Sequence, residues 1–147
     1  MRFLHIPKIV FDSSHYIPGY DGKCGNVHGH SWSVVDLCLG VVDDLNEQGI
    51  SVDFGDIKHY FEEEWDHKLF VPTPDHVCWC EHYNLLLMDP EQIKPLEHTT
   101  CEYIADVIAI DLLAHPGISY VCFQLFEGAS ESSGGVSVVV EIEEDEE

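Results

Sequence analysis

Residues 24–39 read CGNVHGHSWSVVDLCL, and from His28 onward this stretch has the alternation expected of a β-strand. Residues two apart on a strand point to the same face, so His28 and His30 can present both imidazoles to one side of a sheet. We expect the strand to run to about Leu39. Four residues would then share one face, namely Trp32, Val34, Asp36 and Cys38. Two such histidines alone fit partly exposed strand residues as well as they fit a ligand pair.

A preceding strand is expected from about Ile9 to His15, followed by a loop of turn-forming residues at 18–22. This strand ends on a third histidine. An imidazole from such a neighbouring strand would complete a set with His28 and His30. Three histidines are the ligand count of a catalytic zinc ion, which keeps a fourth position open for water or substrate.

Cys24 precedes the two strand histidines and lies between Lys23 and Gly25. A cation or a metal beside a thiol favours the thiolate, so Cys24 is a candidate base that need not bind the metal itself. The alternative is a closed structural zinc site in which Cys24 is the fourth ligand beside three histidines. The spacing between Cys24 and His28 permits either arrangement.

Two carboxylates outside this region are further candidates. Asp66 and His67 have the composition of an orienting carboxylate and a proton carrier, although neighbours on a helix do not face each other. Such a dipeptide is also common on protein surfaces. Glu127 directly follows an apolar stretch, residues 121–126. It could accept two hydrogen bonds from a planar ligand edge, or it could be a solvated strand end.

The rest of the chain predicts two helices followed by two strands. The first helix is indicated by four residues with the spacing of one helical face, Ile57, Tyr60, Phe61 and Trp65. A second helix begins near residues 99–102, which match a capping box, and Pro116 ends it. Strands are expected at 120–126 and 136–142, whereas four prolines interrupt residues 70–98. The order ββααββ predicts an α+β fold, a four-stranded antiparallel sheet with two helices on one face.

Length and charge limit the classes of function. The 147 residues suit one domain, placed at 1–140, with 141–147 as the end of the last strand and an acidic tail. The 28 acidic and 6 basic residues give a net charge of −22, which argues against nucleic acid or an anionic membrane as partner. No stretch approaches the roughly 20 apolar residues of a membrane span, and the first residues do not resemble a signal peptide. We therefore expect a cytoplasmic protein whose six cysteines are free thiols.

Taken together, these motifs resemble those of the 6-pyruvoyltetrahydropterin and 6-carboxytetrahydropterin synthase family. The resemblance extends over nearly the whole chain, and the cysteine ahead of the His-Gly-His triplet is its most specific element. The segment 70–98 is longer than is typical of the family. The matching stretches are FDSSH (11–15), KCGNVHGH (23–30), VDF (52–54), WDHKL (65–69), TCE (100–102) and the strand that ends in Glu127.

The resemblance implies the tunnelling fold, whose subunits assemble into barrels, commonly a hexamer of two stacked trimers with active sites between subunits. The implied roles are zinc binding for His15, His28 and His30, proton acceptance for Cys24, a relay for Asp66 and His67, and anchoring of the pterin ring for Glu127. Lys23, Thr100 and Glu102 would also contact the substrate.

The implied substrate is 7,8-dihydroneopterin triphosphate. The cysteine motif and the short N-terminus favour the carboxy branch of the family. That branch forms 6-carboxy-5,6,7,8-tetrahydropterin for 7-deazaguanine (queuosine-type) synthesis and releases acetaldehyde and triphosphate. Two alternatives stay open, a 6-pyruvoyltetrahydropterin synthase and a non-catalytic module that binds zinc or a pterin.

Overall fold

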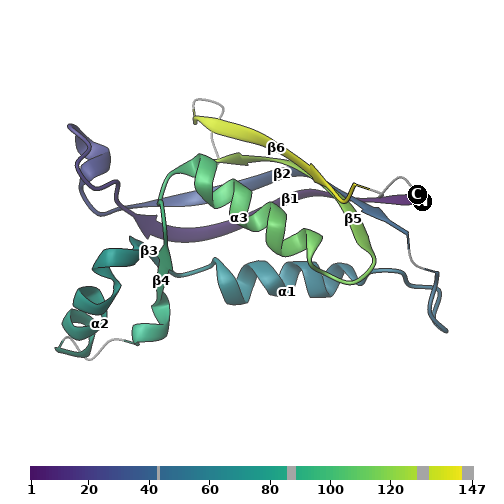
Figure 1. Ribbon diagram of the computed structural model, residues 1–147, viewed down its shortest axis with the longest axis horizontal. Helices are drawn as coiled ribbons and strands as arrows, with labels where there is room; N and C mark the ends of the chain where they lie inside the picture. Colours follow the sequence, from purple (N-terminus) through teal and green to yellow (C-terminus); the bar gives the residue numbers. More distant parts are fainter. Residues whose placement is uncertain (43, 86–88, 129–132, 144–147) are drawn as a thin grey trace.

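The computed structural model describes residues 1–42, 44–85, 89–128 and 133–143, which form one curved sheet with helices along it (Figure 1). The strands lie in the order β4-β3-β1-β2-β5-β6. Their bounds are β1 (Arg2–His15), β2 (His28–Val41), β3 (Leu69–Pro72), β4 (Ile93–Leu96), β5 (Ile118–Phe126) and β6 (Gly135–Glu141). The α-helices are α1 (Phe54–Glu64), α2 (His76–Leu85) and α3 (Cys101–Leu113).

β1 and β2 form the long hairpin at the centre of the sheet. They pair antiparallel from Arg2 opposite Val41 to His15 opposite His28. β1 begins earlier than expected, at Arg2, and continues through Pro7. The other side of β1 pairs with β3 only at Ser14 and His15, so Pro7 lies where a missing N–H removes no bond from that ladder.

The expected faces of β2 are wrong beyond Val35. Asp36 has a positive φ of 52°, and the register with β5 shifts between Val35 and Cys38. Trp32 is buried before this β-bulge and Leu37 is buried after it, whereas Cys38 is only partly buried. An extra residue in one strand reverses the inward and outward alternation beyond it, and the sequence alternation does not reveal it.

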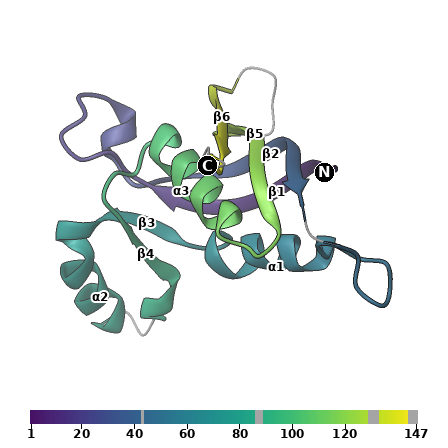
Figure 2. The ribbon, with the colours of Figure 1, turned by 45° about the vertical axis from the view of Figure 1, so that its right-hand side comes forward.

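Helices α1 and α3 lie on the same side of the sheet, as both views show (Figures 1 and 2). The Asp53 carboxylate caps α1 by accepting a 2.7 Å hydrogen bond from the Gly55 amide. Thr100 caps α3, one residue later than a capping box beginning at Thr99 predicts, and its hydroxyl accepts from the Tyr103 amide at 3.2 Å. The side chains buried between sheet and helices include Phe11, Trp32, Phe61, Ile104 and Ile108.

The predicted frame of four antiparallel strands and two helices is present, but the sheet is larger and mixed. The segment that predicted no regular element contains β3, α2 and β4, and both short strands are parallel to their inner neighbours. Leu69, Val71 and Ile93 form a small core there. Strands of four residues that contain Pro72 or Pro95 show no usable alternation, which is why the sequence did not reveal them.

Within the described ranges, no helix combines the length and the apolar character that a bilayer crossing requires. β6 ends at Glu141, and the acidic tail lies outside the described residues from position 144 onward.

Candidate metal centre and active site

Three histidines converge where the β1–β2 hairpin ends. His15 lies opposite His28 in the register, and His30 follows two residues later on the same face. The ring centroids lie 4.5 Å apart for His15 and His28, 5.2 Å for His15 and His30, and 4.8 Å for His28 and His30. One candidate ligand atom from each ring lies within 4.8 Å of the others. The predicted ligand set is therefore brought together by strand pairing.

Backbone carbonyls fix the orientation of two of these rings. The Nδ1–H of His15 donates to the Thr99 carbonyl at 2.7 Å, and that of His28 donates to the Asn26 carbonyl at 2.6 Å. With Nδ1 engaged in this way, Nε2 is the ring nitrogen left to bind a metal, and such second contacts are typical of metal-binding histidines. Nε2 of His15 and of His30 is buried and has no hydrogen-bond partner among the described residues. Buried nitrogens that lack a protein partner fit a divalent metal ion.

Burial favours the neutral form of two of these imidazoles, those of His15 and His30. The His15 side chain is 1% exposed, and this burial lowers its pKa from 6.5 to about 4, against an opposing effect of the Thr99 carbonyl. Burial also lowers the pKa of His30, with a smaller contribution from His28. The neutral form is the one that binds metal, so both ligands are ready near pH 7 without first losing a proton.

Glu127 lies beside this cluster, at the end of β5. Its Oε2 is 4.0 Å from Nε2 of His30, and its side chain is 27% exposed. Burial raises the pKa of Glu127, His28 lowers it, and the nearby Glu102 raises it again. The partly desolvated carboxylate therefore lies next to the three histidines, in a position to contact a ligand bound there.

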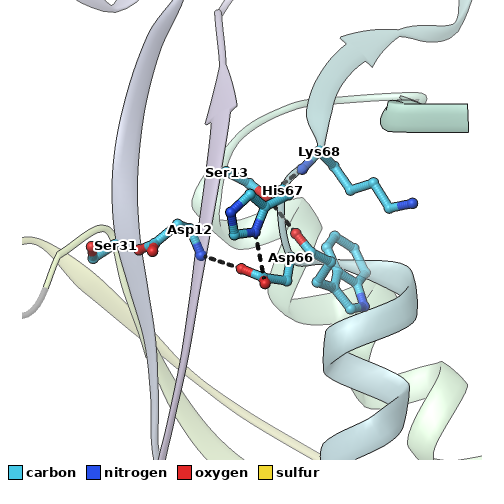
Figure 3. A network of polar contacts seen from close by, with 7 residues as sticks. Asp12, Ser13, Ser31, Asp66, His67 and Lys68 are labelled. Atoms are coloured by element: carbon cyan, nitrogen blue, oxygen red, sulfur yellow. Dashed lines mark hydrogen bonds and ion pairs between the residues drawn. The ribbon is translucent and has the colours of Figure 1, made fainter. Parts of the chain in front are cut away.

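Asp66 and His67 form a hydrogen-bonded pair (Figure 3). Helix α1 ends at Glu64, so the two residues occupy the turn that leads to β3 rather than the far end of a helix. Asp66 Oδ2 lies 2.8 Å from Nδ1 of His67, and Asp66 Oδ1 accepts a hydrogen bond from the Asp12 amide at 2.8 Å. The helical spacing argument did not apply because His67 has a φ of 55°.

One member of the pair and one of the three histidines border an open hollow of about 850 Å³. His30 and His67 both line this hollow, with Lys68 beside them and Tyr83 of α2 on the wall. No hydrogen bond or ion pair among the described residues joins Asp66 or His67 to the three histidines. The long segment 70–98 therefore contributes a wall to the candidate site.

Cys24 lies in a short 3-10 helix, η1 (Lys23–Gly25), in the loop between β1 and β2. Gly25 is required there because a Cβ would lie 2.6 Å from the Tyr20 carbonyl oxygen. Cys24 is partly buried, and the cluster of ligand atoms found among the described residues does not include its sulfur. Lys23 is exposed. This arrangement favours the three-histidine site over a closed site with Cys24 as the fourth ligand.

Thr100 and Glu102 both belong to the start of α3. The Thr100 hydroxyl is engaged in capping the helix, and Glu102 is exposed in the first turn. The sequence did not single out Thr99 or Asn26, whose carbonyls orient the ligand rings. Backbone acceptors leave no sequence signal, although the spacing from His30 to Trp32 could have identified Trp32, whose ring lies 5.3 Å from that of His30.

Removing one imidazole should abolish metal binding. We expect the unchanged protein to retain roughly one divalent metal ion per chain after dialysis, and His15→Ala, His28→Ala and His30→Ala each to lose it, because two ligands hold an ion poorly. Elemental analysis by mass spectrometry measures this. His59→Ala, which removes an exposed imidazole from α1, is the matched control. Full retention of the metal ion in all three site variants would contradict the assignment.

The metal-free protein should become less stable as the pH falls from 6.5 to about 4. In this window the unfolded chain protonates His15 while the folded chain does not, so acid favours unfolding by up to about 3 kcal/mol. Urea unfolding at several pH values, compared with His15→Gln, isolates this effect because the variant lacks the titrating ring. Parallel pH profiles for the two proteins would refute the expectation.

Comparison with known proteins identifies the family of this chain. The model of the 6-pyruvoyl tetrahydropterin synthase family matches residues 7–129. A Pyrococcus horikoshii protein with the provisional name 6-carboxy-5,6,7,8-tetrahydropterin synthase is 37% identical over 72% of this chain and 73% of that protein. A provisionally named counterpart from Archaeoglobus fulgidus is 37% identical over 46% of this chain and 63% of its own length. The 6-carboxy-5,6,7,8-tetrahydropterin synthase of Rickettsia bellii is 35% identical over 46% of this chain and 51% of its own length.

Solved structures show the same fold. The 6-pyruvoyl tetrahydropterin synthase of Plasmodium falciparum superimposes with a TM-score of 0.54 at 16% identity, covering 95% of this chain and 99% of that one. A catalytic-residue mutant of the Plasmodium vivax enzyme gives a TM-score of 0.53 at 15% identity, covering 97% of this chain and 100% of that one. Because the family model covers most of the sequence and the fold agrees, this chain belongs to the 6-pyruvoyl tetrahydropterin synthase family.

Proposed function

We propose that this chain is a zinc-dependent 6-carboxy-5,6,7,8-tetrahydropterin synthase that acts on 7,8-dihydroneopterin triphosphate. The observation that carries the proposal is the convergence of His15, His28 and His30. The Nε2 atoms of His15 and His30 are buried there and have no hydrogen-bond partner among the described residues. The names of the relatives from P. horikoshii, A. fulgidus and R. bellii support the carboxy product.

The proposed division of labour gives each residue one task. Zinc, when bound by the three histidines, supplies a Lewis acid that acidifies hydroxyl groups of the substrate side chain. Cys24 accepts a proton from that side chain. Asp66 holds the His67 ring through the 2.8 Å contact at Nδ1, which leaves Nε2 free to carry a proton. This use of two proton-transfer groups suits a substrate whose side chain has no strongly acidic C–H bond.

Glu127 is proposed to anchor the pterin ring, because its carboxylate is partly desolvated and lies 4.0 Å from Nε2 of His30. Lys23 and Lys68 supply positive charge near the catalytic residues for the triphosphate, in a chain of net charge −22. Lys68 extends to within hydrogen-bond distance of the Glu91 carbonyl, at 3.2 Å. Glu102, in the first turn of α3, lies near enough to Glu127 to raise the pKa of that carboxyl, and we propose that Glu102 and the capping residue Thr100 also contact the substrate.

We further propose that the working unit is a homo-oligomer, a hexamer of two stacked trimers, in which a neighbouring copy covers the site. The His67 side chain is 77% exposed and the Asp66 side chain is 31% exposed. Proton transfer between fixed groups benefits from the exclusion of water, and a single chain leaves this pair open. A second copy seated over the hollow would enclose it.

The direct test is product analysis. The zinc-loaded protein should convert 7,8-dihydroneopterin triphosphate to 6-carboxy-5,6,7,8-tetrahydropterin, with acetaldehyde and triphosphate, as measured by mass spectrometry. Cys24→Ala should lower turnover by roughly 100-fold or more while zinc content is retained, because it removes a proton acceptor rather than a ligand. Cys78→Ala, which removes an exposed thiol on α2, is the matched control.

The other outcomes of this experiment separate the alternatives. A 6-pyruvoyl product would replace the carboxy assignment with the pyruvoyl one. Loss of zinc and of folded structure in Cys24→Ala would indicate a closed structural zinc site. Binding of a pterin without turnover in the unchanged, zinc-loaded protein would indicate a binding module.

Mixing two inactive variants tests the shared site. If Cys24 and His67 of one site come from different copies, oligomers refolded from equal amounts of Cys24→Ala and His67→Ala should recover about a quarter of the unchanged activity by random assembly. Size-exclusion chromatography with light scattering confirms that the mixed oligomers form. Mixed oligomers without recovered activity would place both residues of a site on one chain.

A further inference from the structure

We propose that Ser13 is a positioning residue whose hydroxyl holds the Asp66–His67 pair in its working geometry. The inference rests on the proposed function for its catalytic meaning, since it concerns the proton relay. Ser13 does not carry a proton to the substrate in this account. It acts through the turn of residues 65–68, on which the pair lies.

The Ser13 hydroxyl bridges the two ends of that turn. Its Oγ donates to the Trp65 carbonyl and accepts from the Lys68 amide at 2.9 Å (Figure 3). These two groups come immediately before Asp66 and immediately after His67. A hydroxyl can donate one hydrogen bond while accepting others, so a single serine side chain can serve both. Ser13 is 7% exposed, which protects both bonds from water.

The other hydrogen bonds between β1 and the turn use backbone groups of β1. The His67 amide donates to the Asp12 carbonyl at 2.7 Å, and the Ser14 amide donates to the Lys68 carbonyl at 2.9 Å. Any residue on β1 could supply these groups. By contrast, the bond to the Trp65 carbonyl and the bond from the Lys68 amide both depend on the Ser13 side chain.

The conformation of His67 explains why such a bridge is needed. His67 adopts a φ of 55°, in the left-handed region that a residue with a Cβ occupies at a cost. Such a residue keeps this conformation only when its surroundings over-determine it. Fixing both neighbours through one hydroxyl holds the His67 ring against Asp66, with Nδ1 as the protonated nitrogen that donates to the carboxylate.

Ser13 also connects the relay to the metal-binding hairpin. It lies opposite His30 in the β1–β2 register and two residues before His15, on the same face of β1. The strand pair that places the metal ligands therefore also anchors the turn that carries Asp66 and His67. A shift of about 1 Å in a catalytic group can lower a rate by roughly 100-fold, so this anchoring affects turnover.

Ser13→Ala tests the proposal, with Ser119→Ala as the matched control. Ser119 is also a strand serine that donates to a backbone carbonyl, that of Gly40, and it lies on β5. We expect Ser13→Ala to lower kcat by about 10- to 100-fold with little change in KM or zinc content. Nitrogen-15 NMR of the His67 ring, assigned with His67→Asn, should show the proton moving from Nδ1 towards Nε2. Ser13→Thr, which restores the hydroxyl, should recover most of kcat and return the His67 ring signals towards those of the unchanged protein.

Several results would overturn the proposal. One is a folded Ser13→Ala variant whose kcat lies within twofold of the unchanged protein and whose His67 ring signals do not move. A variant with a lower Tm but unchanged ring signals would assign Ser13 a structural role only. If Ser13→Ala does not fold, the hydrogen-exchange rate of the Lys68 amide in the unchanged protein tests the bridge instead. Exchange as fast as in an exposed loop would refute the bridge. If the unchanged protein has no synthase activity, the proposed function fails while the NMR result still decides the positioning role.

Discussion

The antiparallel pairing of β1 with β2 places His15 opposite His28 and brings His30 onto the same face. Everything proposed for the site depends on this register, because a shift of one residue would send the imidazoles of one strand to the other face of the sheet. The buried Trp32 continues the face that carries His28 and His30, and its ring lies 4.9 Å from that of His15. Through Trp32, the three histidines pack against the main hydrophobic core.

Burial and chemistry are linked at this cluster. Desolvation keeps His15 neutral, and the carbonyl of Thr99, from the segment before α3, determines which ring nitrogen faces inward. An isolated buried nitrogen without a partner is costly, so the arrangement makes physical sense when a cation occupies the space between the rings. Residues far apart in the sequence therefore act together on one ligand set.

The same strand also organises the second chemical group. Asp12 and Ser13 of β1 contact the turn that carries Asp66 and His67. The same strand carries His15 and pairs with β2, which carries the other two candidate metal ligands. A single hairpin therefore positions both the candidate metal ligands and the turn that carries the pair. Segment 70–98, which contains none of the motifs that indicated the family, adds Tyr83 to the wall of the hollow beside His67.

The sequence alone determined the strand histidines, the presence of helices α1 and α3, and the strand that leads to Glu127, because periodicity is a local property. It could not determine the bulge at Asp36, the short parallel strands β3 and β4, or the contact between Asp66 and His67. Those features arise from pairing between distant segments and from a left-handed turn, which local patterns do not encode. Tertiary structure decided which candidates meet, since only the packed chain brings the Thr99 carbonyl to His15 and the Ser13 hydroxyl to the turn.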